Sequence, residues 1–343
     1  MASGKKVYYP YMGLVRYVLA LGVVIAHFNE ATQHLVPIYP AYYRVGGFFA
    51  LSGFLVYPSF CKAGNLKTFY RNRAVRILPA YIFIILLCAI GLSAVSTLPL
   101  HEYFTSPVFW KYLAANLTFQ NWLQPSLPGV FEGADFLTPA VNAALWTMKV
   151  DWCLYLTVPI LFWVVKKWNI NRNKLIISII VLSVLYRILF LWMYDMTGRA
   201  FYEILSRQIF GQASYYYAGL LIYFNQEKFT KHLAVYIILS FILIFSSFAI
   251  PYGLYILTPV ALSGAVLGVA LIGKTERKPD QSHNISYQMY IFHYPLIKLL
   301  IYFHLAQLPA AAALSILLAA IILLSLFSQY CVEGPIIKRL RRR

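Results

Sequence analysis

The feature that most constrains this chain is a succession of apolar stretches, each about long enough to cross a bilayer as a helix. A helix needs about 20 apolar residues for one crossing, and such stretches, interrupted by charges and prolines, recur along the chain. They predict spans at 11–29, 45–61, 78–96, 145–165, 175–194, 208–224, 233–250, 254–273, 285–304 and 310–331. Apolar residues make up 61% of the 343 residues, where a soluble domain averages about 45–50%. The sequence therefore predicts an all-α polytopic membrane protein and argues against a soluble enzyme.

The positive charge of the chain indicates how these spans are oriented. The formal net charge is +18, from 29 basic and 11 acidic residues. With a cytoplasmic N-terminus, 21 of the 29 basic residues fall on segments predicted to lie inside, as the positive-inside rule requires. We therefore predict about ten transmembrane helices with both termini cytoplasmic. The same distribution excludes a nucleic-acid binder, because the charges are divided among short loops and form no single basic patch.

The chain reads as a single transmembrane domain over residues 1–343, with an extracytoplasmic loop at about 97–144. That loop is rich in proline and aromatic residues, which argues against another span and favours a partly ordered cap. We expect no cleavable signal peptide, because the first apolar stretch contains Arg16 and lacks a small-residue cleavage site. The four cysteines lie far apart, so we expect packing residues and no metal site.

Two polar residues in the first span are candidates for function. His27 follows Arg16 by eleven positions, which in a helix places both side chains on one face, roughly 16 Å apart along the axis. A charge inside a span normally faces a protein interior or an aqueous cavity. The alternative is that Arg16 reaches the inner headgroups and His27 makes an interfacial hydrogen bond.

Further charges gather near the predicted ends of other spans. Arg73 and Arg76 lie three residues apart on one helical face at the inner mouth of the third span, and their guanidinium groups suit phosphate. The alternative is a topological anchor. Asp151, near the outer end of the fourth span, is at about the depth of His27 and could orient its imidazole, or it could pair with Lys149 or Arg187 as a structural bridge.

Two residues near the C-terminus complete the candidates. His293 falls in the inner half of the ninth span, where it could contact a substrate or hold two helices together. Glu333, at the inner end of the tenth span, is expected to neutralise a cytoplasmic arginine rather than to do chemistry.

Six segments together resemble the motifs of the membrane-bound acyltransferase 3 family, in residue type and in order. They are Arg16 with His27, Phe48–Phe54, Arg73 with Arg76, Leu145–Trp152, Ser286–His293 and Val332–Pro335. One departure is Asp151, which stands where the family more often has glutamate. The chain also resembles the stand-alone members, which lack an appended SGNH-type hydrolase domain.

The resemblance implies a bacterial O-acyltransferase of the inner membrane that takes an acyl group from acetyl-CoA, or another acyl-CoA, and needs no metal. It implies His27 and Asp151 as catalytic residues and Arg16, Arg73 and Arg76 as the coenzyme A site. A substrate-contacting or supporting role is implied for Ser52, Trp146, Tyr290, His293 and Glu333. The expected acceptor is a hydroxyl of a cell-surface glycan or lipid-linked sugar. Glu30, one turn after His27, is a rival to Asp151 as the residue that orients the imidazole.

A membrane transporter of an acyl group, a sugar or a small anion is the main alternative, because buried charges also line translocation paths. It predicts inverted repeats and paired broken helices, and the sequence contains no evident repeat. Aromatic residues of the outer segment, such as Trp110, Trp122, Phe131 and Phe136, could stack on sugar rings or form an interfacial belt. The particular sugar and the acyl chain are not readable from the sequence.

Overall fold

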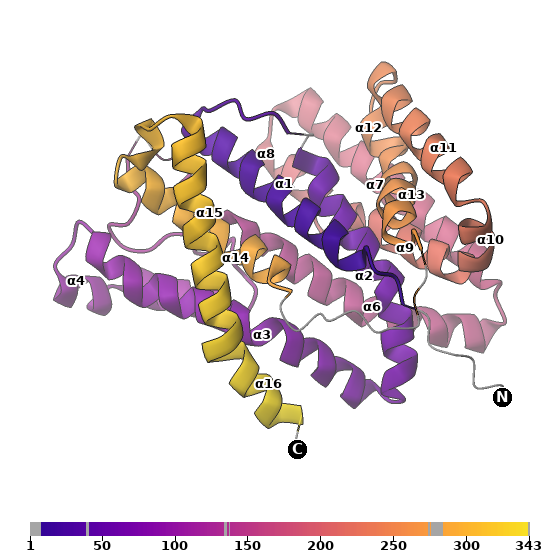
Figure 1. The fold of residues 1–343 in the computed structure, drawn as a ribbon, viewed down its shortest axis with the longest axis horizontal. Helices are drawn as coiled ribbons and strands as arrows, with labels where there is room; N and C mark the ends of the chain where they lie inside the picture. Colours follow the sequence, from indigo (N-terminus) through magenta and orange to yellow (C-terminus); the bar gives the residue numbers. More distant parts are fainter. Residues whose placement is uncertain are drawn as a thin grey trace. The chain divides into compact units, whose positions relative to one another are not determined.

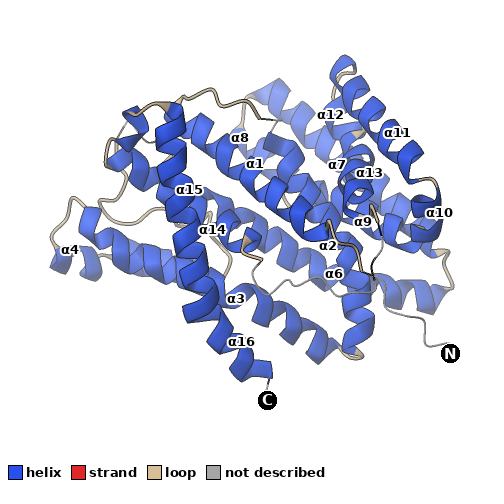
Figure 2. Ribbon diagram, viewed as in Figure 1, coloured by secondary structure: helices blue, strands red, loops and turns tan. Residues whose placement is uncertain are grey.

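The computed structural model describes residues 8–38, 41–133, 136, 138–273, 275 and 284–341, and within this part the chain is helical apart from loops and one isolated antiparallel bridge between Tyr8 and Thr275 (Figures 1 and 2). The longer helices are α1 (Met12–Thr32), α2 (Ala41–Ala63), α3 (Leu66–Gly91), α6 (Trp146–Trp168), α7 (Arg172–Thr197), α9 (Ile209–Phe224), α11 (Leu233–Ser246), α13 (Thr258–Ala270), α14 (Ser286–Tyr302) and α15 (Ala310–Phe327). Shorter helices are α4 (Leu100–Thr105), α5 (Pro107–Leu117), α8 (Ala200–Ser206), α10 (Gln226–Lys231), α12 (Gly253–Ile256) and α16 (Gly334–Arg341). The all-α prediction is confirmed for the described residues.

Each predicted span coincides with a helix, but the helices differ in their ability to cross a membrane. Within the part of the chain that the structure describes, six helical stretches are long and apolar enough by themselves: Met12–Thr32, Val45–Ala63, Leu66–Val95, Ala143–Trp168, Arg172–Thr197 and Ala310–Leu340. The other four predicted spans fall on α9, α11, α13 and α14, which have 16, 14, 13 and 17 residues. The protein is thus a multi-pass membrane protein, while the count of ten spans and the cytoplasmic termini stay predictions.

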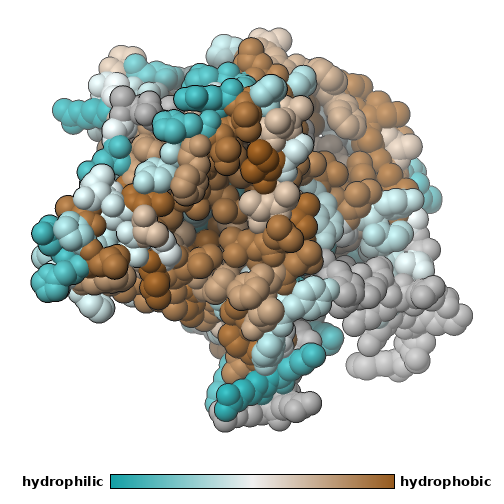
Figure 3. Space-filling view, turned by 60° about the vertical axis from the view of Figure 1, so that its left-hand side comes forward, coloured by the Kyte–Doolittle hydropathy of each residue, from teal (hydrophilic) through white to brown (hydrophobic). Residues whose placement is uncertain are grey.

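The outer surfaces of the helices are rich in large apolar side chains. Leu182, Leu185 and Leu189 of α7, for example, are 64%, 56% and 50% exposed. In Figure 3, apolar side chains fill the middle of the face in view, and polar side chains lie toward its edges. An apolar surface of this extent is expected to contact lipid.

The chain forms two compact units, each assembled from separate stretches of sequence. The first unit contains Met1–Leu19, Tyr42–Phe69 and Val150–Gln281, and the second contains Ala20–Ala41, Tyr70–Lys149 and Ser282–Arg343. In the first unit α7 packs along α9 and α11 along α13; in the second, α14 packs along α15 (Figure 1). The assignment of residues 1–343 to one domain stays a prediction.

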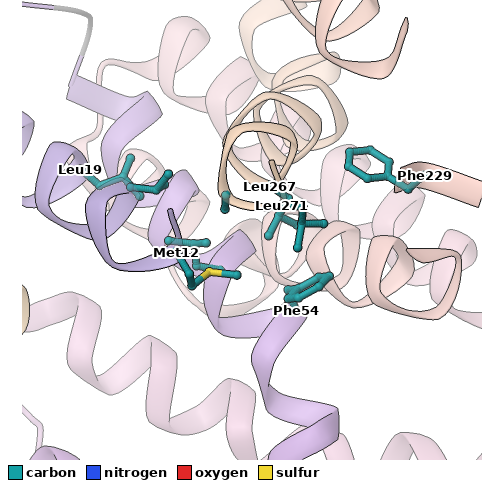
Figure 4. Packing of buried hydrophobic residues seen from close by; sticks show 9 residues of the cluster. Met12, Leu19, Phe54, Phe229, Leu267 and Leu271 are labelled. Carbon is teal, nitrogen blue, oxygen red and sulfur yellow. The ribbon is translucent and has the colours of Figure 1, made fainter. Parts of the chain in front are cut away.

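A buried apolar cluster fills the first unit where α1, α2, α10 and α13 meet (Figure 4). Met12 and Leu19 come from the start of α1, Phe54 from α2 and Phe229 from α10, and all four are at most 7% exposed. α13 adds Leu267, and Leu271 follows directly after it. Their apolar surface is removed from both water and lipid, so close packing is the main gain.

The segment predicted as a loop at about 97–144 carries only short helices among its described residues, so no further span is found there. Its later part is held by hydrogen bonds from the residues that follow α3 and the short helix η1 (Leu92–Val95): the Thr97 amide donates to the Gly129 carbonyl at 2.9 Å, and the Ser96 hydroxyl to the Pro128 carbonyl at 2.8 Å. Tyr103, on α4, donates to the Ala89 carbonyl at 2.8 Å. This phenol is buried, and the loss of solvation raises its pKa. These contacts tie the segment to the other parts of the second unit. Its role as a cap and its extracytoplasmic location stay predictions.

Two glycines allow α2 and α9 to touch through their backbones. A Cβ at Gly53 would lie 1.8 Å from the Tyr216 carbonyl oxygen, and one at Gly219 would lie 2.0 Å from that of Ala50. Each helix thus presents a glycine to the backbone of the other helix. In α2, Gly53 lies three residues after Ala50, and in α9, Gly219 lies three residues after Tyr216. Small residues are what permit such close helix contacts in membrane proteins.

This contact predicts that Gly53→Ala lowers the free energy of unfolding by about 1–3 kcal/mol, because the methyl group forces α2 and α9 apart. Thermal unfolding of the purified protein in detergent measures the effect. Gly91→Ala is the matched control, since a Cβ there meets nothing closer than 4.0 Å. Equal unfolding midpoints for the two variants would contradict the close contact.

Candidate functional site

The residues singled out in the sequence divide between the two units. The first unit holds Arg16, Ser52 and Asp151, and the second holds His27, Arg73, Arg76, Trp146, Tyr290, His293 and Glu333. Within each unit several of these residues are in direct contact. Those contacts define two polar centres, one around His27 and His293 and one around Asp151.

The centre of the second unit is a hydrogen bond between two histidines 266 residues apart in the sequence. Nδ1 of His27, in α1, lies 2.7 Å from Nε2 of His293, in α14. The rings are nearly parallel, at 6°, with centroids 5.0 Å apart. The distance between the ring centroids is close to the nitrogen–nitrogen distance plus the radius of each ring. The two rings therefore lie side by side in nearly one plane and meet at their edges. His293 therefore holds α1 and α14 together. Because the two rings are in contact, His293 lies at the same depth as His27, and the prediction that His293 lies in the inner half of its span while His27 lies near the outer end is wrong.

The far side of the His293 ring determines which nitrogens carry protons. Its Nδ1 lies 2.6 Å from the carbonyl oxygen of Tyr290. A carbonyl can only accept, so this Nδ1 carries the hydrogen. In neutral His293 the other nitrogen, Nε2, is then an acceptor, and His27 must donate to it from Nδ1. Neutral His27 therefore carries its lone pair on Nε2.

The sequence around His293 explains how α14 supports this arrangement. Pro295 has no backbone N–H, so it leaves the carbonyl of Ile291 without its helical donor. Asn142 supplies one from its side-chain amide at 2.8 Å, while its own Oδ1 caps the short helix η2 (Ala143–Leu145) at the Ala144 amide. The proline and the asparagine thus link α14 to the start of α6.

A second link joins the same two helices through a motif residue. The hydroxyl groups of Thr147 and Tyr290 lie 2.9 Å apart, and Thr147 also donates to the carbonyl of Ala144 at 3.0 Å. Because a hydroxyl has one proton, Tyr290 donates to Thr147. Tyr290 thus supports the site twice, with its carbonyl on His293 and its hydroxyl on α6. Trp146 begins α6 beside Thr147 and is partly buried.

Two further residues of α14, Tyr294 beside His27 and Lys298 beside Tyr294, were not among the predicted site residues. The ring of Tyr294 meets that of His27 edge-on, with centroids 5.4 Å apart. Lys298, one turn later, is 2% exposed, donates to the Thr138 carbonyl at 2.6 Å, and has its ammonium 5.0 Å from the Phe136 ring centroid. The sequence signal that could have identified Lys298 as a site residue was its position as a lysine inside an apolar stretch. Of the outer aromatic residues, Trp110 and Trp122 are 60% and 67% exposed, whereas Phe131 is buried.

In the first unit, Asp151 is part of a separate hydrogen-bonded group. The Ser52 hydroxyl lies 2.7 Å from Oδ1 of Asp151 and 3.0 Å from the hydroxyl of Tyr155. Ser52 has one proton, and the carboxylate is the stronger acceptor, so Ser52 donates to Asp151 and accepts from Tyr155. The alternative pairing of Asp151 with Arg187 is not found among the described residues. Its predicted orientation of His27, and the rival role of the exposed Glu30, stay predictions.

The arginines of the predicted coenzyme A site lie near the start of α3 and α1. Arg73 is partly buried and Arg76 is exposed. Nearby, Arg71 donates to the carbonyl of Leu340 in α16, and the Tyr287 hydroxyl donates to the Ile77 carbonyl at 3.1 Å. These contacts tie α16 and α14 to α3 beside the two arginines. Arg16, partly buried, belongs to the start of α1 in the first unit.

Glu333 ends a π-helical turn, η5 (Ser328–Glu333), and pairs with no arginine among the residues that the structure describes, contrary to expectation. Its carboxylate accepts from the side-chain amide of Gln288 and from the hydroxyl of Ser328, each at 2.8 Å. Glu333 is 3% exposed, and no basic side chain of the described residues contacts it. The wider turn brings both Ser328 and Glu333 to the same buried position, so this residue links α15 to the first turn of α14.

Comparison with known proteins identifies the family. The model of the acyltransferase 3 family, described as an acyltransferase domain, matches residues 9–329. Nodulation protein 10 of Rhizobium leguminosarum bv. viciae is 27% identical over 144 residues, which cover 40% of this chain and 37% of that protein. The chain thus matches little more than a third of this relative's length. No solved structure gives a significant match. Because the family model covers nearly the whole chain, the protein belongs to the acyltransferase 3 family and is a membrane acyltransferase.

Proposed function

We propose that this membrane acyltransferase moves an acyl group, acetyl in the simplest case, from cytoplasmic acyl-CoA to a hydroxyl of a cell-surface or lipid-linked glycan in a bacterial inner membrane. The observation that carries the proposal is the chain of hydrogen bonds from His27 through His293 to the Tyr290 carbonyl. It holds one protonation form of His27, with the lone pair on Nε2. Acyl transfer to a hydroxyl needs a group of this kind to take the proton of the attacking oxygen.

The proposed reaction uses that lone pair. As the acceptor oxygen attacks the thioester carbonyl, the new C–O bond forms, the C–S bond breaks, and Nε2 of His27 takes the hydroxyl proton. The proton then passes to the departing sulfur, so free coenzyme A leaves as a thiol. The same lone pair suits a two-step route in which Nε2 attacks the thioester first and an acyl-imidazole is the intermediate.

His293 is a positioning residue in this scheme. Its Nε2 accepts from His27 before and after proton transfer, so the imidazolium that forms keeps its hydrogen bond. The edge-to-edge geometry also fixes the direction of the His27 ring, since rotation would break a 2.7 Å contact. Its role corresponds to that of the third member of a catalytic triad, with a neutral partner in place of a carboxylate.

The donor site is proposed from charge. Coenzyme A carries several phosphate charges, and Arg73 and Arg76 lie on one face of α3 with guanidinium groups that suit phosphate oxygens. Arg16 is proposed to meet the phosphates deeper along the entry path, and the pantetheine arm to extend toward His27. The acceptor class, a glycan hydroxyl, rests on the resemblance to the family's O-acetylases.

The first prediction concerns the two histidines. His27→Ala should lower kcat by about 10²- to 10⁴-fold, the usual contribution of a general base. His293→Leu should lower kcat substantially with little change in KM for acetyl-CoA, because the His27 tautomer is no longer held. His293→Gln should recover part of the loss, since its amide oxygen can accept from His27. Thioester cleavage and free coenzyme A release in reconstituted vesicles measure the rates and separate an enzyme from a transporter.

A double variant shows whether His293 acts through His27. If it does, His293→Gln has no further effect when His27 is already alanine. Two independent, multiplying losses would mean that His293 has a separate role. Full activity of His27→Ala would refute the assignment of the base.

The second prediction concerns the donor site. Arg73→Ala combined with Arg76→Ala should raise KM for acetyl-CoA by about tenfold or more, because charge-assisted phosphate contacts are lost. KM for acetyl-pantetheine, which has the thioester but no nucleotide phosphates, should not change. Lys111→Ala, an exposed lysine of α5, is the control and should leave both values unchanged. A parallel rise for both donors would place the arginines outside the nucleotide site.

A further inference from the structure

Tyr294 lies beside the proposed base, and the proposed reaction gives its hydroxyl no role. Its ring meets the ring of His27 edge-on, with centroids 5.4 Å apart and an angle of 82° between the ring planes. It meets the ring of His293 in the same way, at 6.2 Å and 79°. All three residues belong to the second unit. The Tyr294 ring is therefore in place against both members of the histidine pair.

Two other tyrosines of α14 use their hydroxyl groups to hold the fold together. Tyr287 donates to the Ile77 carbonyl at 3.1 Å, and the hydroxyl of Tyr290 lies 2.9 Å from that of Thr147. The Tyr294 hydroxyl, in contrast, makes no hydrogen bond to any residue that the structure describes. Helix packing thus accounts for the first two hydroxyl groups and leaves the third without a structural use.

The Tyr294 hydroxyl is also open to its surroundings. Tyr294 as a whole is 9% exposed, so most of its ring is covered. Some hydroxyl oxygens of the described residues, such as that of Tyr112, are sealed inside the fold without a partner, but the Tyr294 oxygen is not one of them. The exposed part of the side chain therefore includes this oxygen. His27 is itself only partly buried, so two adjacent groups are accessible.

A buried lysine helps to hold the ring in this position. The Lys298 ammonium lies 5.7 Å from the centroid of the Tyr294 ring, a distance at which a cation and an aromatic ring attract each other. The ammonium is fixed in turn by its donation to the Thr138 carbonyl at 2.6 Å. The direction of the phenol is thus set before a substrate binds. A donor that needs no reorganisation is the kind that stabilises transition-state charge most effectively.

We propose that Tyr294 is a catalytic residue whose hydroxyl donates a hydrogen bond to the carbonyl oxygen of the acyl group during transfer. This role rests on the proposed function, in which His27 is the base. When the acceptor oxygen attacks the thioester carbon, the π electrons of the C=O bond move to the carbonyl oxygen, which becomes an oxyanion. Tyr294 donates to this oxyanion and keeps its proton. As the C–S bond breaks, the electron pair returns to the carbonyl, and the sulfur leaves with the bonding pair and takes the proton from Nε2 of His27.

The positions of the two side chains suit this division of roles. In the tetrahedral intermediate the acceptor oxygen and the oxyanion are bonded to the same carbon. The acceptor oxygen is hydrogen-bonded to Nε2 of His27 and the oxyanion to Tyr294, each bond being about 2.7–2.9 Å long. Side chains that bind two oxygens of one carbon must be neighbours, as are these two rings with centroids 5.4 Å apart.

Tyr294→Phe tests the proposal, because it removes the hydroxyl and keeps the ring. Loss of one oxyanion donor lowers kcat by about 10²- to 10³-fold. We expect a loss of this size, with KM for acetyl-CoA changed by less than about twofold, since the hydrogen bond gains its strength in the transition state. Tyr302→Phe changes an exposed tyrosine of the same helix and should behave as wild type. Thermal unfolding midpoints should be the same in both variants.

The rate is measured as release of free coenzyme A from acetyl-CoA by inverted membrane vesicles of expressing cells, which retain their own acceptor. Vesicles that contain His27→Ala give the background. If wild type does not exceed this background, the proposed function itself fails. If wild type is active and Tyr294→Phe equals it, the role of Tyr294 alone is refuted. A rise in KM for acetyl-CoA with unchanged kcat would refute it too, because the hydroxyl would then act in donor binding.

A second variant covers the case in which Tyr294→Phe is less stable than wild type. Incorporation of 3-fluorotyrosine at position 294 changes the ring but retains a phenol donor. This protein should keep the activity that Tyr294→Phe loses. Equal losses in the two proteins would mean that the shape of the ring matters and its hydroxyl does not, which would contradict the proposal.

Discussion

A polar group carried into an apolar interior must find a partner there, because neither lipid nor packed side chains can replace water as donor or acceptor. α14 shows how much structure follows from this constraint. Pro295 leaves the Ile291 carbonyl without its helical donor, and the Asn142 side-chain amide donates to it instead. The His293 side chain donates to the carbonyl of Tyr290. Gln288 at one end and Lys298 toward the other are each bound to a different segment of the chain. The polar residues of α14 therefore bond this helix to α1, to the start of α6, to η5 and to the segment at 97–144.

Glycine has the complementary role where backbones meet. Gly53 follows Ser52 directly, so the close contact of α2 with α9 also fixes the position of the hydroxyl that donates to Asp151. A motif of serine and glycine thus combines a packing requirement with a chemical one. Because Ser52 and Gly53 are neighbours, a change that moves α2 away from α9 is expected to move the Ser52 hydroxyl as well.

Local patterns were enough to predict where the helices lie, because apolar length is a property of each stretch alone. They were also enough to select His27, Arg73 and Asp151, since a charge inside or beside a span stands out without reference to the rest of the chain. The partners of these residues were not predictable in the same way. His293 is 266 residues from His27, and its depth was misjudged because span boundaries are uncertain by about four residues. Glu333 was assigned an arginine on charge alone, whereas a π-helical turn places it beside Gln288 and Ser328.

A neutral partner has a specific consequence for a base inside a membrane protein. A carboxylate beside His27 would stabilise the imidazolium, but it would also add a charge that must be solvated in the resting enzyme. In the proposed mechanism neutral His293 fixes the tautomer and ring direction of neutral His27 through its hydrogen bond and adds no charge to the pair. In the proposed reaction, charge develops on the pair only as the acceptor oxygen attacks. In this view the stabilisation of that charge must come largely from groups that the substrates bring with them, above all the thiolate that leaves, to which the proton is passed.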